Sequence, residues 1–187
     1  GRGCPFTCSF CTIINVQGHK SRQRSIESIE NIIRDNVKQG LSSFFISDDD
    51  FARNKNWESI LDKFIELREV YKLKISFTIQ VDTLCYNLPG FIEKSGRAGV
   101  KRAFIGLENI NPDSLLGASK RQNKITDYRA MLLAWKKVGV ITCCGYILGF
   151  PSDTQESILR DIEIIKKELP VDLLEFFYLT PFPGSED

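Results

Sequence analysis

Three cysteines lie within the first eleven residues of this 187-residue chain, at Cys4, Cys8 and Cys11. Thiolates on one short loop can converge on a metal centre. A closed structural site takes four protein ligands, whereas a reactive site keeps one position open for water or substrate. The three cysteines therefore need a fourth ligand from a distant part of the chain, from a partner, or from a bound small molecule. The last arrangement would make the protein an enzyme.

The overall composition is that of an ordinary globular domain. Hydrophobic residues make up 42% of the chain and charged residues 26%, with a formal net charge of +1. This balance gives no electrostatic reason to expect nucleic acid or an anionic membrane as partner. No apolar run approaches the roughly 18 residues of a membrane span, and no leader precedes the cysteines. We expect one cytoplasmic domain covering residues 1–187.

The other cysteines have different surroundings. Without an export signal, the clustered first three favour metal binding or redox chemistry over disulfides. Cys85 lies beside a strand end, and Cys143 and Cys144 lie inside an apolar run. Free cysteine behaves as a small hydrophobe in such places, so all three are expected in or near the core. Trp57 and Trp135 are expected to pack there as well.

Short apolar runs alternate with helical patterns along the chain. Continuous runs typical of parallel strands cover residues 43–46, 75–79, 103–107, 142–148 and 173–179. Helical periodicity lies between them, at 26–37, 60–67 and 158–169, and Gly40 and Gly139 are expected to end helices. This alternation predicts an α/β fold, either an open doubly wound sheet or part of a β/α barrel. No Gly-x-Gly-x-x-Gly follows the first strand, which argues against dinucleotide binding.

Polar and glycine-rich segments follow the expected strands. They are Asp48-Asp49-Asp50, Gln80-Val81-Asp82, Gly106-Leu107-Glu108, the segment from Gly145 to Gly149, and the segment from Thr180 to Gly184. The carboxyl ends of parallel strands meet at one edge, where ligands bind. Several polar strand ends at the same edge of the sheet therefore favour a ligand site over loops that are simply exposed to solvent.

With these tips in view, the chain closely resembles the radical S-adenosylmethionine (SAM) superfamily. Cys4, Cys8, Phe10 and Cys11 are similar to its Cys-x3-Cys-x2-Cys loop. Asp48-Asp49-Asp50-Phe51 resembles an acidic segment of members that carry a cobalamin-binding domain. Gly106-Leu107-Glu108, Gly145-x-Ile147-x-Gly149 and the segment from Thr180 to Gly184 resemble later strand-end motifs of the family.

The resemblance implies a partial (β/α)6 TIM-like barrel with a [4Fe–4S] cluster on the three cysteines. SAM would chelate the unique iron, and one electron would cleave it to methionine and a 5′-deoxyadenosyl radical that takes hydrogen from substrate. An electron donor such as flavodoxin or ferredoxin is implied, and the small-molecule substrate is not identified. Cobalamin, held by a domain outside this chain, is a further implied cofactor.

The resemblance also implies roles for individual residues. Cys4, Cys8 and Cys11 would be cluster ligands, and backbone near Phe10 and at Gly145, Ile147 and Gly149 would contact adenine. Asp48 and Asp49 are candidates for the methionine amino group. Gln80 and Glu108 are candidates for the ribose or the methionine moiety. No catalytic acid or base is expected from the protein itself, since the cofactor performs the difficult step.

The chain departs from the family pattern at both ends. The family's first strand normally runs into the cysteine loop, whereas this chain begins at Gly1 and stops at Asp187. We therefore expect a fragment of a larger protein, whose sheet exposes an apolar edge. Alone, it should hold little or no cluster unless a neighbouring chain covers the gap. About four irons per chain would contradict this expectation.

Simpler interpretations remain for each motif. The cysteines could form a zinc site with His19, although His19 lies beyond the usual short spacing. Asp48, Asp49 and Asp50 could be the acidic approach to a helix, and Gly106 and Gly145 could be packing glycines. The rival classes are a non-catalytic metal-binding scaffold and a methylthiotransferase, which would need three more cysteines grouped in an upstream domain.

Overall fold

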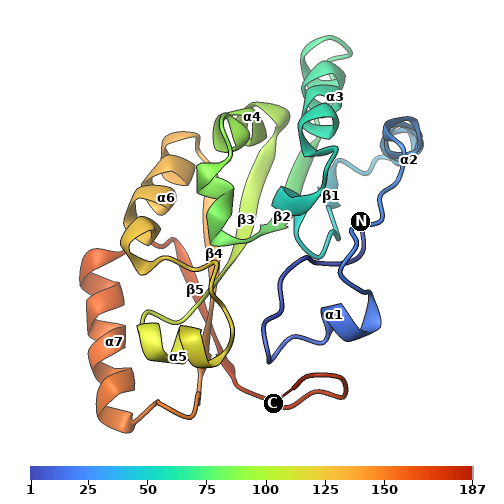
Figure 1. Ribbon diagram of the computed structural model, residues 1–187. Helices are drawn as coiled ribbons and strands as arrows, with labels where there is room; N and C mark the ends of the chain where they lie inside the picture. The colour runs from blue at the N-terminus through green and yellow to red at the C-terminus, as the bar shows by residue number, and fades with distance from the viewer. Residues whose placement is uncertain (187) are drawn as a thin grey trace.

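The computed structural model describes residues 1–186 and contains a five-stranded parallel sheet with strand order β1-β2-β3-β4-β5 (Figure 1). The strands are β1 Ser43–Phe45, β2 Ser76–Val81, β3 Val100–Glu108, β4 Ile141–Leu148 and β5 Leu173–Tyr178. Every strand expected from the sequence is present. The α/β prediction is therefore confirmed.

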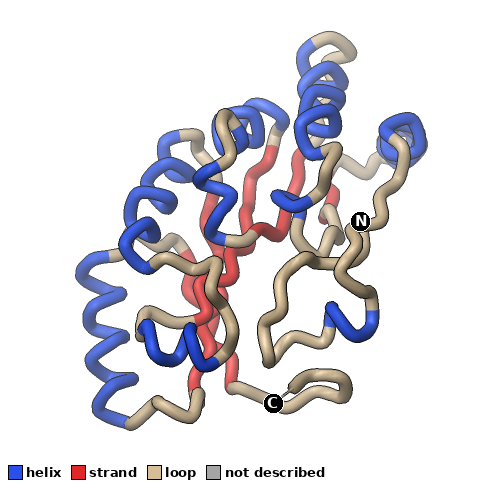
Figure 2. Tube along the Cα trace, in the orientation of Figure 1, coloured by secondary structure: helices blue, strands red, loops and turns tan. Residues whose placement is uncertain are grey.

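Helices fill the connections between the strands. The α-helices are α1 Ile13–Val16, α2 Ile26–Lys38, α3 Trp57–Glu69, α4 Phe91–Ala98, α5 Pro112–Gly117, α6 Ile125–Lys137 and α7 Gln155–Glu168, with short 3₁₀ turns η1 Phe51–Arg53 and η2 Thr83–Asn87. Helices α3, α4, α6 and α7 cover one face of the sheet, whereas the N-terminal loop, α1 and the C-terminal segment lie on the other side (Figures 1 and 2). None of the helices in residues 1–186 combines the length and apolarity needed to cross a bilayer.

Each strand pairs in parallel with the next strand in the chain. Right-handed βα connections that always step in the same direction curl a sheet toward a barrel. Within the described residues the sheet stays open, with β1 and β5 as its edges. This arrangement confirms the predicted partial barrel.

The main core lies between the sheet and its outer helices. The ring of Phe64 in α3 stacks on Phe77 in β2 with 4.0 Å between centroids, and Trp135 in α6 meets Phe91 in α4 edge to face. Trp135 is fully buried and Trp57 is partly buried against the same core. Both predictions for the tryptophans are confirmed.

Local signals behave as the sequence indicates. Gly40 follows α2 and Gly139 follows α6, each with a positive φ that ends the helix. Cys85, Cys143 and Cys144 are buried, as expected for hydrophobic cysteines. Because these three cysteines are buried, the polar residues at the carboxyl ends of the strands are the candidates for a functional site.

Candidate functional site

The cysteine loop is fastened to the body of the protein by backbone hydrogen bonds. Arg2 forms an antiparallel bridge with Arg22, and the Cys4 amide donates to the Gly18 carbonyl at 3.2 Å. On the opposite side, the Ser9 amide donates to the carbonyl of Ala118, at the end of α5, at 3.1 Å. The loop therefore lies across the carboxyl edge of the sheet, attached at both sides.

Gly3 makes the close approach at the start of this loop possible. Its φ is +97°, and a Cβ at this position would lie 2.4 Å from the Lys20 carbonyl oxygen. Its amide donates to Asp49 Oδ2 at 2.5 Å, which connects the loop to the end of β1. Any side chain at position 3 would meet the Lys20 carbonyl and would be strained at this positive φ, so only glycine fits here without a shift of the backbone.

All three loop cysteines line one cavity of about 160 Å³, which we call the cysteine cavity. Its other walls come from the carboxyl ends of β1, β2 and β3 and from the segment after α5. The residues that matter most for chemistry are Phe10, Asp49, Asp50, Gln80, Asp82, Glu108, Lys120 and Gln122. The structure thus brings four predicted residues, Phe10, Asp49, Gln80 and Glu108, to the cavity that the three cysteines line.

Glu108 reaches the cavity through an unusual backbone. The pairing of β3 with β4 shifts between Gly106 and Glu108, and Glu108 has a φ of +61°. A Cβ on Gly106 would lie 2.4 Å from Glu108 Oε1, so glycine leaves the space that this carboxylate occupies. Irregular strand ends of this kind re-aim side chains at functional sites. Gly106 therefore does more than pack within a strand.

Lys120 is the cationic partner of Glu108. Its Nζ lies 2.7 Å from Glu108 Oε1, and both side chains are nearly buried, at 10% and 12% exposure. Burial alone would lower the pKa of Lys120, but the charges of Glu108 and Cys8 outweigh it and raise that pKa above its usual value. The Lys120 ammonium also lies 5.6 Å from the centre of the Phe10 ring. A fixed positive charge thus faces the cysteines.

A second charged group forms the wall at the ends of β1 and β2. Arg53 binds Asp82 through two hydrogen bonds, at 2.5 Å and 3.2 Å. Burial, together with the neighbouring Asp82 carboxylate, raises the pKa of Asp50 well above its usual value. Asp50 also caps η1 by accepting a hydrogen bond from the Ala52 amide. These carboxylates hold the wall together, whereas Asp49 bonds the loop backbone at Gly3.

The donor set of the cavity fits an iron–sulfur cluster. Burial is the main cause that raises the pKa of Cys4 to about 11 and raises the pKa of Cys11, and nearby thiols add to both shifts. The three cysteines line the same cavity, and three cysteine thiolates are ligands that such a cluster uses. A cluster takes cysteine thiolates, so its insertion would displace these protons. Among residues 1–186 no three His, Cys, Asp or Glu side chains are already gathered as a single-ion site.

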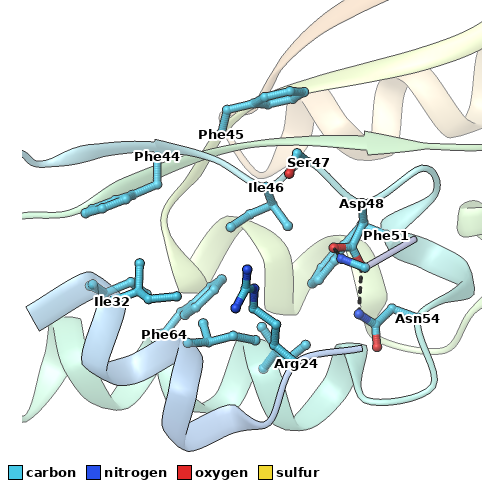
Figure 3. Close-up of a pocket in the computed structure, with 14 residues that line it drawn as sticks. Arg24, Ile32, Phe44, Phe45, Ile46, Ser47, Asp48, Phe51, Asn54 and Phe64 are labelled. Atoms are coloured by element: carbon cyan, nitrogen blue, oxygen red, sulfur yellow. Dashed lines mark hydrogen bonds and ion pairs between the residues drawn. The ribbon is translucent and has the colours of Figure 1, made fainter. Parts of the chain in front are cut away.

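Asp48 lies elsewhere than the resemblance implied. It is buried and accepts a hydrogen bond from Asn54 Nδ2 at 2.7 Å. It lines a separate cavity of about 220 Å³ between α2, α3 and β1, which Figure 3 shows with Phe44, Ile46 and Phe64 around it. Asp48 therefore borders this second cavity, whereas its neighbour Asp49 borders the cysteine cavity.

The candidates on β4 fall outside the cysteine cavity. A Cβ on Gly145 would lie 3.1 Å from the Phe104 ring, so Gly145 packs beneath that ring. Ile147 belongs to a small apolar cluster with Phe10 and Phe150, directly against the loop. Gly149 follows β4 with a φ of +95° and donates its amide to Asp153 at 2.8 Å. Ile147 therefore packs against Phe10, whereas Gly145 packs against Phe104.

Comparison with known proteins agrees with this arrangement. A sequence model described as the Radical SAM superfamily matches residues 1–165. The chain belongs to this family. Curated relatives of the chain include proteins named as methyltransferases.

Two curated relatives extend over almost the whole chain. Bacteriochlorophyllide d C-12(1)-methyltransferase of Chlorobaculum tepidum is 29% identical over 98% of this chain and 40% of its own length. The uncharacterized methyltransferase PH0819 of Pyrococcus horikoshii is 30% identical over 98% of this chain and 39% of its own length. The chain thus spans about two fifths of the relatives that it matches.

A solved structure shares the fold. The radical SAM methyltransferase TsrM from Kitasatospora setae, with cobalamin and a [4Fe–4S] cluster bound, superposes with a TM-score of 0.82 at 18% identity. The match covers 98% of this chain and 36% of that chain. The sequence model thus confirms the family, and this structure confirms the fold.

The sequence did not single out Lys120 or Gln122 as site residues. They lie in an ordinary polar segment between α5 and α6 and match no short motif. Gln122 Nε2 donates a hydrogen bond to Cys8 Sγ at 3.3 Å. The only sequence signals near these two residues are the end of a helix after Gly117 and the polar run of residues 119–124. Such signals are found in ordinary surface loops as well, so they do not identify a site.

Proposed function

We propose that this radical SAM chain binds a [4Fe–4S] cluster through Cys4, Cys8 and Cys11, and SAM in the adjoining cysteine cavity. The single observation that carries the proposal is the meeting of the three cysteines with Asp49, Gln80, Glu108 and Lys120 around one cavity. When bound, the cluster and SAM together supply a one-electron cleavage of the sulfonium. The protein's own residues bind and orient.

The charges around the cavity complement the methionine end of SAM. That end carries an ammonium and a carboxylate, and charge-assisted hydrogen bonds to such groups are strong. Asp49 and Glu108 offer carboxylates for the ammonium, and Lys120 offers an ammonium for the carboxylate. Gln80, whose amide donates to the Asp48 carbonyl at 3.3 Å, remains a candidate for the ribose.

The apolar cluster beside the loop suits the adenine. The Phe10 and Phe150 rings lie 6.2 Å apart edge to face, with Ile147 next to them. Such a surface packs against a flat base, and the Gly149 carbonyl can accept a hydrogen bond from the adenine amino group, since the Gly149 amide already donates to Asp153. We propose that Phe10, Ile147 and Gly149 hold adenine and that Gly145 acts indirectly by seating Phe104.

Methyl transfer is the reaction class that the relatives favour. The curated relatives described above are named as methyltransferases, and cobalamin is bound in the TsrM structure. We propose that the full-length protein is a cytoplasmic, cobalamin-dependent methyltransferase that acts on a small molecule and takes electrons from a flavodoxin or a ferredoxin. An upstream Asp-x-His-x-x-Gly cobalamin signature would support this proposal.

Methylthio transfer is the rival reaction. It needs a second cluster on three further cysteines grouped in an upstream domain, so the sequence of that region decides between the two reactions. A purely structural metal site is the rival outside catalysis. The charged cavity beside the cysteines favours an enzyme over a scaffold, because a scaffold has no use for a ligand site there.

The test is product formation by the reconstituted full-length protein. With dithionite and SAM, the wild type should form 5′-deoxyadenosine and methionine, and with added cobalamin it should also form S-adenosylhomocysteine. Cys8→Ala should form none of these, whereas Cys143→Ala, which alters a buried cysteine in β4, should retain them. A colourless protein that holds one zinc and leaves SAM intact would overturn the proposal.

A further inference from the structure

One loop cysteine receives a hydrogen bond from a side chain. Gln122 Nε2 donates to Cys8 Sγ at 3.3 Å, a distance within the range for a sulfur acceptor. Both residues are buried, with 8% and 6% of their surface exposed. Bulk water therefore competes little for this contact, and a hydrogen bond in such a place is electrostatically stronger than one in water.

The other two loop cysteines have backbone partners instead. Cys4 has a backbone hydrogen bond at Phe6, and Cys11 has one at Ile13, each of which favours the thiolate. Those contacts follow from the shape of the loop and cannot be removed by exchanging a side chain. The amide of Gln122 comes from 114 residues away in sequence, so it can be changed without touching the loop.

The segment that carries Gln122 is held firmly. Thr83 Oγ1 donates to the Gln122 carbonyl at 3.4 Å and to Asn123 Oδ1 at 3.2 Å. Asn123 Nδ2 in turn donates to the carbonyls of Gly106 and Leu107 at the end of β3. Because η2, β3 and this segment are joined by buried hydrogen bonds, the Gln122 amide is positioned before any cluster is present.

We propose that Gln122 is a positioning residue that sets the reduction potential of the cluster held by Cys4, Cys8 and Cys11. The inference rests on the proposed function. A ligand sulfur gains negative charge when its cluster takes up an electron, so an N–H donor stabilises the reduced state more than the oxidised one. The Gln122 amide therefore raises the potential and eases the one-electron reduction.

The test is an EPR-monitored redox titration of the reconstituted full-length protein. Gln122→Met keeps the length of the side chain and removes the donor, and Gln122→Glu keeps the shape but replaces the donor by an acceptor. At the wild-type midpoint, the ratio of reduced to oxidised cluster should fall about tenfold in Gln122→Met, equal to about 59 mV for one electron. The fall should be larger in Gln122→Glu, because a carboxylate repels the added electron.

Gln39→Met is the matched control. It makes the same substitution at an exposed glutamine just after α2, whose side-chain amide donates to the Asp35 carbonyl of its own helix, so its midpoint should stay near that of the wild type. Equal midpoints in wild type, Gln122→Met and Gln122→Glu at full iron content would overturn the inference. Loss of the cluster from both Gln122 variants, with Gln39→Met still loaded, would also overturn it by giving Gln122 a holding role. A wild type without any cluster would instead overturn the proposed function.

Discussion

The ion pair between Lys120 and Glu108 is the contact on which the charge of the cysteine cavity depends. Both side chains are nearly buried, and the pair also faces Cys8 and Phe10. A buried charge that loses its partner is costly because water does not replace the partner. Single changes at this pair should therefore affect both stability and binding.

We expect Lys120→Met to lower the free energy of unfolding by about 3–5 kcal/mol, because it leaves the Glu108 carboxylate buried and unpaired. Urea unfolding measures this loss. Arg97→Met is the control: it breaks an exposed pair with Glu69, at 65% and 47% exposure, and should cost under about 1 kcal/mol. The double variant Lys120→Met with Glu108→Gln should recover part of the loss. An equal loss of unfolding free energy in Lys120→Met and Arg97→Met would show that the buried pair stabilises the protein no more than the exposed one.

At the scale of elements, the position of the cysteine loop depends on Gly3 and on the backbone hydrogen bonds between the loop and residues 18–22. We expect Gly3→Ala to detach the loop, since its Cβ would meet the Lys20 carbonyl at 2.4 Å. Hydrogen exchange at the Cys4 amide, which bonds the Gly18 carbonyl, should accelerate while the sheet stays protected. Gly40→Ala shares a positive φ but has open space around its Cβ, so it should cost only the roughly 1–2 kcal/mol of the left-handed backbone. Unchanged exchange at Cys4 would contradict this account.

Helix α6 is joined to the end of β3 by the Tyr128 hydroxyl. This group donates toward the carbonyls of Leu107 and Asn109 and accepts from Asn123 at 2.8 Å. We expect Tyr128→Phe to lower the free energy of unfolding by about 1–3 kcal/mol, because buried polar groups lose a partner. Tyr71→Phe, at a tyrosine that is 50% exposed, should change it by less than about 0.5 kcal/mol. Thermal unfolding of the two variants compares them, and a negligible change at Tyr128 would refute the role.

The strands and the cysteine loop were predictable from the sequence because apolar runs and cysteine spacing are local signals. The same holds for Phe10, Asp49, Gln80 and Glu108, which follow strands or lie within the loop. The resemblance places Asp48 at the same site as Asp49, but Asp48 lies in the irregular segment after β1, where no alternation rule gives the side that each residue faces, and it lines the other cavity. Lys120 and Gln122 reach the cysteines only through tertiary packing, which no local pattern encodes.

At the scale of the whole molecule, the open sheet leaves apolar edges. Phe45 on β1 is 57% exposed, and Phe177 on β5 is 45% exposed. Unpaired edge strands of this kind pair with other chains. We expect residues 1–187 to self-associate at high concentration and Phe45→Lys to reduce this, as measured by light scattering. Tyr86→Lys adds the same charge in η2, away from the edge, and should leave association unchanged. A wild-type chain that stays monomeric would contradict the expectation.

The central claim is that Cys4, Cys8 and Cys11 together hold a [4Fe–4S] cluster. Iron and acid-labile sulfide, assayed in the full-length protein after anaerobic reconstitution, test it most directly. The account predicts about four more irons per chain in the wild type than in Cys8→Ala, with Cys143→Ala equal to the wild type. Equal iron content in wild type and Cys8→Ala, or a single zinc in place of iron, would contradict it.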